Sequence, residues 1–227
     1  MNRTIIFDFD GVLANSEIIA LAELQACLAD YGVDYDWNDL VAIFLGASLK
    51  QITGHITERT GRDVHDEFQR EWYRRLFERY ERELQPIAGA SALLDRLDAA
   101  GINYCIASGG SYERLGIALN CIGLAERFTG RAFSADSVAH GKPAPDLFLF
   151  AAKKLGVEPG HCLVIEDATA GVLAAKRAEI RVLGFVGGDH LKGIRDEHAQ
   201  RLIATGAAGV LTSLADFDLA AFEELPA

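Results

Sequence analysis

Thr4-Ile5-Ile6-Phe7-Asp8-Phe9-Asp10-Gly11-Val12-Leu13 is the stretch that decides the fold of this chain. Its apolar residues up to Phe7 predict a buried strand, and two carboxylates follow where that strand ends. Residues i and i+2 of an extended chain point the same way, so we expect Asp8 and Asp10 to share one side. Two like charges this close repel each other, and Mg²⁺, which prefers carboxylate oxygen, would relieve that repulsion. The simpler alternative is a strand end with two solvated acids.

Length and charge limit the classes of protein and partner. The chain has 227 residues, of which 50% are hydrophobic, so it can form one large domain or a domain with a small insertion. The net charge is −11, from 22 basic and 33 acidic residues. This balance argues against a nucleic-acid or anionic-membrane partner, because such a partner requires a basic patch. We expect a monomer or a weak homodimer.

The cysteines and the start of the chain indicate a cellular compartment. Cys27, Cys105, Cys121 and Cys162 show no paired metal-ligand spacing, and two of them lie in apolar runs, where free cysteine behaves as a small hydrophobe. We therefore expect reduced thiols and a cytoplasmic protein. No signal peptide or transmembrane helix is expected, because the first strand starts almost at Met1 and charges interrupt the long apolar stretches.

Residues 15–84 have the pattern of helices, without a strand signal. Ser16 is expected to cap the first helix, and further helices are predicted over residues 37–44 and after Ser48. A fourth, charged helix ends before Pro86 and has an apolar residue at every fourth position, namely Val64, Phe68, Trp72, Leu76, Tyr80 and Leu84. Its arginines are expected to form a solvated face with paired acids, with phosphate binding as the alternative.

After Pro86 helices and strands alternate. Strands are predicted over residues 103–107, 131–134, 162–165, 182–186 and 210–211, and helices over residues 91–100, 111–121, 147–155 and 169–178, with another that ends near Leu202. We therefore predict an α/β fold with a doubly wound, mostly parallel, Rossmann-like sheet. Residues 1–14 and 85–227 would form the core domain, and residues 15–84 an inserted, all-helical cap domain that could exclude water from a site.

Three of the predicted strands end in charged or small polar residues. Asp8 and Asp10 follow the first strand, Glu166-Asp167 follows the fourth, and Ser108-Gly109-Gly110-Ser111 follows the second. Small residues before a helix can cradle a phosphate on backbone N–H groups, although an ordinary turn has the same composition. A loop stiffened by two prolines adds Lys142, which otherwise would be a surface lysine. Ligands bind at the carboxyl ends of strands in open α/β sheets, so we expect these groups to meet.

In order and context these groups resemble the four motifs of the haloacid dehalogenase-like (HAD) hydrolase superfamily, in the branch with a helical cap after the first motif. The resemblance implies phosphoryl transfer through an aspartyl-phosphate, with Asp8 as the nucleophile. Asp10, protonated by charge crowding, would be the acid and base. The resemblance also implies that Ser108, Gly109 and Lys142 bind phosphate. It implies a Mg²⁺ site, with Asp8, Asp10, Glu166 and Asp167 as the candidate ligands.

The same resemblance places a loop that contacts substrate within Leu45-Gly46-Ala47-Ser48-Leu49-Lys50. Its candidate contact residues are Gly46, Ser48 and Lys50. The beta-phosphoglucomutase relatives have an arginine at the position of Leu49, and this departure weakens the case for a mutase. The cap region is similar to that of 6-phosphogluconate phosphatase. We therefore expect a Mg²⁺-dependent phosphatase whose substrate is a small phosphate ester, namely a sugar or sugar-acid phosphate.

Several other functions remain open at this point. A sugar phosphomutase of the beta-phosphoglucomutase type is the main alternative. Asp10 disfavours a haloacid dehalogenase and a phosphonoacetaldehyde hydrolase, and the complete set of catalytic groups disfavours a non-catalytic regulatory protein. Neither His140 nor the loop Gly187-Gly188-Asp189-His190 receives a role, since small turn residues are typical of any loop.

Overall fold

Parallel strands form the sheet at the centre of the fold. A computed structural model describes residues 3–223, so residues 1–2 and 224–227 of the predicted core domain lie outside the described part. The strands are β1 (Thr4–Phe7), β2 (Asn103–Ser108), β3 (Ala132–Ser134), β4 (Cys162–Glu166), β5 (Arg181–Phe185) and β6 (Val210–Leu211). Over the described residues they form one six-stranded sheet, in the order β3-β2-β1-β4-β5-β6, with every neighbouring pair parallel. The predicted α/β fold class is confirmed.

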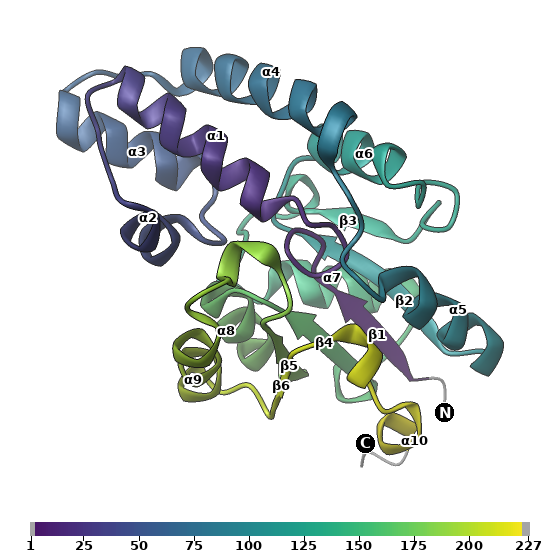
Figure 1. The fold of residues 1–227 in the computed structure, drawn as a ribbon. Helices are drawn as coiled ribbons and strands as arrows, with labels where there is room; N and C mark the ends of the chain where they lie inside the picture. The colour runs from purple at the N-terminus through teal and green to yellow at the C-terminus, as the bar shows by residue number, and fades with distance from the viewer. Residues whose placement is uncertain (1–2, 224–227) are drawn as a thin grey trace.

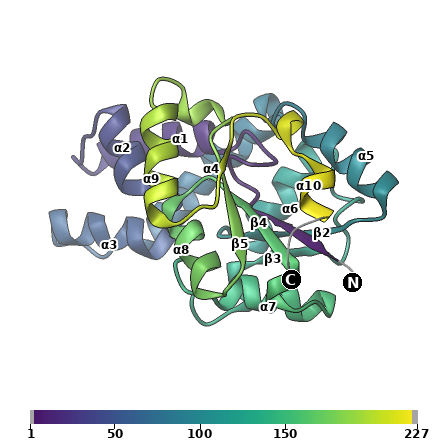
Figure 2. The ribbon, with the colours of Figure 1, turned by 90° about the horizontal axis from the view of Figure 1, so that it is seen from below.

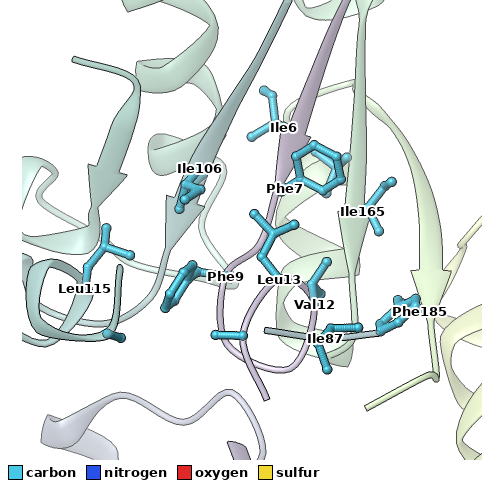
Figure 3. Packing of buried hydrophobic residues seen from close by; sticks show 14 of the residues in the cluster. Ile6, Phe7, Phe9, Val12, Leu13, Ile87, Ile106, Leu115, Ile165 and Phe185 are labelled. Carbon is cyan, nitrogen blue, oxygen red and sulfur yellow. The ribbon is translucent and has the colours of Figure 1, made fainter. Parts of the chain in front are cut away.

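β1 lies in the middle of the sheet because it is apolar on both faces. All four of its residues are buried, and the register pairs Phe7 with Ile106 of β2 and with Ile165 of β4. Figure 3 shows these side chains packed around the end of β1. A parallel strand that is covered on both faces reads as a continuous apolar run, which explains why the sequence predicts this strand. Cys105 and Cys162, in the two neighbouring strands, are free and buried, as predicted.

Helices cover both faces of the sheet. They are α5 (Ala90–Ala100), α6 (Tyr112–Cys121), α7 (Asp146–Leu155), α8 (Thr169–Arg177), α9 (Arg195–Thr205) and α10 (Leu219–Glu223), with a short 3₁₀ segment, η3 (Asp189–Leu191), after β5. Figure 2 shows α7 and α8 on one side of the sheet and α5 and α10 on the other. The fold is therefore doubly wound. Each of the helices α5 to α8 begins and ends within one residue of the bounds predicted from the sequence.

A helical block lies beyond the carboxyl ends of the strands (Figure 1). It consists of α1 (Glu17–Asp30), α2 (Trp37–Phe44), α3 (Leu49–Thr60) and α4 (His65–Glu83). The apolar stripe of α4 is buried as predicted, and the Trp72 indole N–H donates to the Ala20 carbonyl of α1 at 3.3 Å. The division of the chain into a core and a cap domain stays a prediction. Within residues 3–223 no single helix is long and apolar enough to cross a membrane. α2 and α3 meet the length and composition criteria only when taken together, and the two helices are bent by 120° relative to each other.

The arginines of α4 form ion pairs on its solvent-facing side. Arg74 lies 2.8 Å from both Glu71 and Glu78, and Arg79 lies 2.7 Å from Glu83. Exposed pairs at this spacing contribute a few tenths of a kcal/mol each. The predicted solvated face with paired acids is thus confirmed for these arginines, and their partners leave little reason to assign them to phosphate.

Candidate active site

Three buried carboxylates meet where the strand order of the sheet reverses. β1 lies between β2 and β4, so the carboxyl ends of β1 and β4 flank the crevice in which open α/β sheets bind ligands. Asp8 directly follows β1, and its backbone N–H donates to Ile165 of β4 at 2.9 Å. Glu166 ends β4 and Asp167 follows it. Carboxylate oxygens of Asp8, Glu166 and Asp167 lie within 4.8 Å of one another.

Lys142 inserts its ammonium group between two of these acids. Its Nζ lies 2.5 Å from Oδ1 of Asp8 and 2.7 Å from Oε2 of Glu166, and only 8% of its side chain is exposed. The Nζ also lies 5.0 Å from the centre of the Phe148 ring. Lys142 is therefore a buried member of the site, rather than the surface lysine that the sequence left as the alternative.

The electrostatics of the cluster suit a divalent cation. Burial, followed by the charge of Glu166, raises the pKa of Asp8 to about 8. Burial and the charge of Asp8 likewise raise the pKa of Asp167. Although burial lowers the pKa of Lys142, the carboxylates of Asp8 and Glu166 keep it above its ordinary value. Three buried acids thus lie beside one lysine ammonium, which bonds two of them. Hard oxygen ligands with surplus negative charge fit Mg²⁺.

Asp10 is held apart from this cluster. Its Oδ1 accepts hydrogen bonds from Arg114 at 2.8 Å and from the Ser16 hydroxyl at 2.6 Å, and its Oδ2 accepts one from Ser108 at 3.3 Å. A guanidinium therefore neighbours Asp10. Burial is the main cause of the raised pKa of Asp8 and of Asp167, and the charge of Asp10 adds to both, so carboxylates lie near Asp10 as well. The protonation of Asp10 stays a prediction. The Asp10 carboxylate is absent from the metal-ligating group found among the described residues, so the geometry does not support it as a side-chain ligand. The predicted capping role of Ser16 is wrong, because its hydroxyl serves Asp10.

The small residues after β2 form a turn that leads into α6. Ser108 ends β2, and its hydroxyl accepts the Gly110 N–H at 3.0 Å. Ser111 then caps α6 through the Arg114 N–H at 3.2 Å. Gly109 and Gly110 line the same cavity as Asp8, so the structure brings the predicted phosphate cradle to the carboxylate cluster.

A cavity of about 390 Å³ lies between the sheet edge and the helical block. The predicted loop residues Gly46, Ser48 and Lys50 line it from the block. Ser48, however, caps α3 in a reciprocal pair with Gln51, so its hydroxyl already has a structural task. A side chain at Gly46 would meet Ala168 at 2.8 Å, which shows how closely this loop approaches the end of β4. Lys50 is exposed at the cavity.

Two residues of the cavity escaped the sequence analysis. Arg114 contacts Asp10, lies 3.3 Å from the Tyr80 hydroxyl of α4 and is almost buried. A positively charged residue in the first turn of a helix is unfavourable because it lies at the positive end of the helix dipole. This unfavourable position of Arg114 could have pointed to a role in the site. Glu17 opens α1 beside the site, and burial, followed by the charge of Asp10, raises its pKa to about 8. His140 is exposed and lies 3.2 Å from Asp146, so its side chain faces solvent.

Comparisons with known proteins agree with this geometry. The model of the haloacid dehalogenase-like hydrolase family matches residues 2–179. The chain is 31% identical over 185 residues to the putative phosphatase YhcW of Bacillus subtilis (strain 168), covering 80% of this chain and 82% of that protein. It is 27% identical over 193 residues to the 6-phosphogluconate phosphatase of Escherichia coli (strain K12), covering 85% and 86%.

A solved structure and two longer relatives complete the comparison. A hydrolase from Pseudomonas syringae superposes with a TM-score of 0.82 at 28% identity, over 100% of both chains. The chain spans 17% of Protein SUPPRESSOR OF QUENCHING 1 and 55% of a bifunctional riboflavin kinase/FMN phosphatase, both from Arabidopsis thaliana. YhcW and the Escherichia coli relative are both named as phosphatases. From its sheet, its strand-end motifs and the match of the family model, the chain belongs to the haloacid dehalogenase-like hydrolase family.

Proposed function

We propose that this chain is a Mg²⁺-dependent phosphatase of a small phosphorylated metabolite. The observation that carries the proposal is the buried Lys142 ammonium, which bonds both Asp8 and Glu166 at the sheet edge. A carboxylate held next to a fixed cation can attack a phosphoryl group whose negative charge that cation offsets. Membership of the hydrolase family and the phosphatase relatives support the same chemistry.

In the proposed reaction Asp8 is the nucleophile. One oxygen of Asp8 attacks phosphorus in line with the leaving oxygen, and an aspartyl-phosphate forms on that carboxylate. Lys142, the Ser108 hydroxyl and the backbone N–H of Gly109 stabilise the phosphoryl oxygens. Asp8, Glu166 and Asp167 would hold Mg²⁺, which would supply further positive charge to the reacting phosphoryl group. Because these protein groups are fixed by the sheet edge, little reorganisation accompanies the transfer.

Asp10 is the proposed acid and base. It donates a proton to the leaving oxygen and then takes one from the water that hydrolyses the aspartyl-phosphate. The Ser16 hydroxyl and the Arg114 guanidinium bond Oδ1 of Asp10 and thereby hold the carboxylate in one orientation. Arg114 and Ser16 are positioning residues in this scheme, since they act through Asp10.

The substrate that we propose is a sugar phosphate or a sugar-acid phosphate. A cavity of about 390 Å³ suits a small molecule and is too small for a macromolecule. The helical block of residues 15–84 would act as a cap domain over it, with the exposed Lys50 as a cation for an anionic distal group. A relative at 27% identity is named a 6-phosphogluconate phosphatase, which supports this substrate class. Leu49 offers no charge to a second phosphate, so a mutase is disfavoured.

Phosphate release from a panel of phosphorylated sugars, sugar acids and nucleotides tests this function. We expect release with Mg²⁺ and none with EDTA. The Asp8→Asn variant should lose at least about 10⁴-fold in kcat because it lacks the nucleophile, while the exposed Asp34→Asn variant should match the parent protein. An active Asp8→Asn enzyme would refute the role of Asp8. If no ester releases phosphate but sugar phosphate isomers interconvert, the chain is a mutase.

Other sequence expectations stay predictions. These are the cytoplasmic location, the monomeric or weakly dimeric state, and the lack of nucleic-acid and membrane partners. Size-exclusion chromatography with light scattering measures the oligomeric state directly.

A further inference from the structure

The loop after β5, to which the sequence analysis gave no role, carries a histidine beneath the carboxylate cluster. His190 lies in η3 and its side chain is fully buried. Its Nε2 lies 3.1 Å from Oδ2 of Asp167. Burying a polar ring costs free energy unless it finds a partner, and Asp167 is the group that the ring faces.

Two glycines leave room for this ring. A Cβ on Gly11, which has a φ of +79°, would lie 1.9 Å from Oδ2 of Asp167 and 2.8 Å from Cε1 of His190. A Cβ on Gly188 would lie 2.6 Å from the same Cε1. The backbone after β1 and the backbone after β5 therefore both pack directly against the contact between His190 and Asp167.

The Nε2 of His190 lies close to Oδ2 of Asp167, but the two atoms do not have hydrogen-bond geometry. Nε2 and Nδ1 of His190 and Oδ2 of Asp167 are buried, and no described residue satisfies them with hydrogen-bond geometry. Buried polar atoms are nearly always paired in native proteins. A small rotation of the Asp167 carboxylate would direct Oδ2 at the Nε2–H and leave the other oxygen for a cation.

A second pair fixes the loop that carries His190. The Asn15 side-chain amide donates to Oδ2 of Asp189 at 2.7 Å, and the backbone N–H of Asp189 donates to Oδ1 of Asn15 at 3.2 Å. Asn15 lies in the segment that joins the Asp8–Asp10 motif to α1. The loop is thus attached on one side to Asp167 and on the other to the segment that enters the helical block.

We propose that His190 is a positioning residue for Asp167, and that the Asn15–Asp189 pair holds His190 in place. The Nε2–H of His190 binds Oδ2 of Asp167 and fixes the carboxylate with its second oxygen toward Asp8 and Glu166. Outer partners of this kind orient metal ligands and are commonly worth about 10- to 100-fold in metal affinity. The inference rests on the proposed function, because it takes Asp167 as a ligand of Mg²⁺.

The test is Mg²⁺ affinity, measured by titration calorimetry on the whole chain, with the Mg²⁺ dependence of kcat and the substrate KM as second readouts. We expect His190→Leu to weaken Mg²⁺ binding about 10- to 100-fold, while the substrate KM at saturating Mg²⁺ changes less than about twofold. His190→Gln, whose amide can donate from the position of Nε2, should retain most of the affinity. The matched control is His161→Leu, at the amino end of β4.

Each outcome decides the question. Unchanged Mg²⁺ affinity in folded His190→Leu overturns the inference, and so does a His190→Gln variant as weak as His190→Leu. If the His190 variants do not fold, the Asn15→Ala variant provides the test. We expect it to lose several-fold in Mg²⁺ affinity, and an unchanged Mg²⁺ affinity would overturn the inference. A parent protein that neither binds Mg²⁺ nor releases phosphate overturns the proposed function as well. If the parent protein binds Mg²⁺ and releases phosphate, and His190→Leu binds Mg²⁺ with equal affinity, the inference is overturned and the proposed function stands.

Discussion

The edge of the sheet and the helical block face the same cavity, but they hold their polar groups differently. At the edge, the buried Lys142 ammonium bonds the buried carboxylates of Asp8 and Glu166 at 2.5 and 2.7 Å. In the block, Lys50 is exposed and Ser48 is engaged in capping α3. Fixed, buried charges are suited to catalysis. Exposed groups are suited to substrate recognition, because they can be substituted without disturbing the reacting groups. The contrast predicts large, coupled effects at the edge and small, separable ones in the block.

The largest effect is expected at Lys142. Lys142→Met removes the cation that bonds Asp8 and Glu166, so phosphate release should fall at least about 10³-fold. In EDTA the free energy of unfolding in urea should fall by about 3 kcal/mol, because breaking a buried ion pair leaves uncompensated acids. Lys153→Met, at an exposed position of α7, is the control. Unchanged stability and activity would place Lys142 outside the site.

Arg114 joins the two regions, and its replacement tests whether they act separately. It bonds Asp10 on one side and the Tyr80 hydroxyl of α4 on the other. A lysine cannot reproduce the planar fork, so Arg114→Lys should lower kcat about 10- to 100-fold with little change in KM. Steady-state kinetics measure both constants, with Arg127→Lys as a surface control. A variant with changed KM and unchanged kcat would assign Arg114 to recognition.

The effect of Mg²⁺ on stability should depend on pH. The pKa of Asp8 is raised from 3.8 to about 8, so between these values the metal-free folded state binds more protons than the unfolded state. The contribution of Asp8 to stability is therefore present at low pH and is lost as the pH rises toward 8. Mg²⁺ requires the ionised carboxylate, so its stabilising effect should grow over the same range. Saturating Mg²⁺ should raise Tm by roughly 5 °C at about pH 8 and by much less at about pH 5. An equal rise at both pH values contradicts the assignment, and Asp8→Asn should flatten the dependence.

The smallest effect is expected in the block. Lys50→Ala should raise the KM of esters with a second anionic group by roughly tenfold or less, and should leave kcat unchanged, because the side chain is exposed and touches none of the reacting groups. Lys154→Ala, on α7, is the matched control. A loss of kcat in Lys50→Ala would show that the block takes part in the chemistry.

The sheet and the strand-end residues could be predicted because local sequence encodes them. The apolar runs of β1 and β4 lead directly into Asp8 and into Glu166-Asp167, so strand and site are read from the same few residues. The turn after β2 and its capping Ser111 follow equally from local composition. Parallel topology then brings these ends together.

The contacts that sequence reasoning missed join residues far apart in the chain. Arg114 meets Asp10 across 104 positions, and Asn15 meets Asp189 across 174. No periodicity or turn chemistry marks such pairs. Ser16 is a case in which local sequence predicted the wrong contact. Serine before a helix is a typical cap, but the Ser16 hydroxyl instead donates to Asp10 at 2.6 Å. Tertiary partners overrode the local preference there.

The central position of β1 has a consequence for synthesis on the ribosome. β1 precedes the other described strands of the sheet in the chain, yet its register pairs Thr4 with Asn103 of β2 and with Cys162 of β4. The apolar β1 run of the nascent chain therefore stays unpaired until residues 103–108 have been synthesised, and chaperones bind apolar segments exposed in this way. Asp8 likewise gains its acidic neighbours only when β4 docks. A chain released before residue 166 would lack Glu166 and Asp167, two of the three acids of the cluster, so the proposed activity would report that β4 has docked.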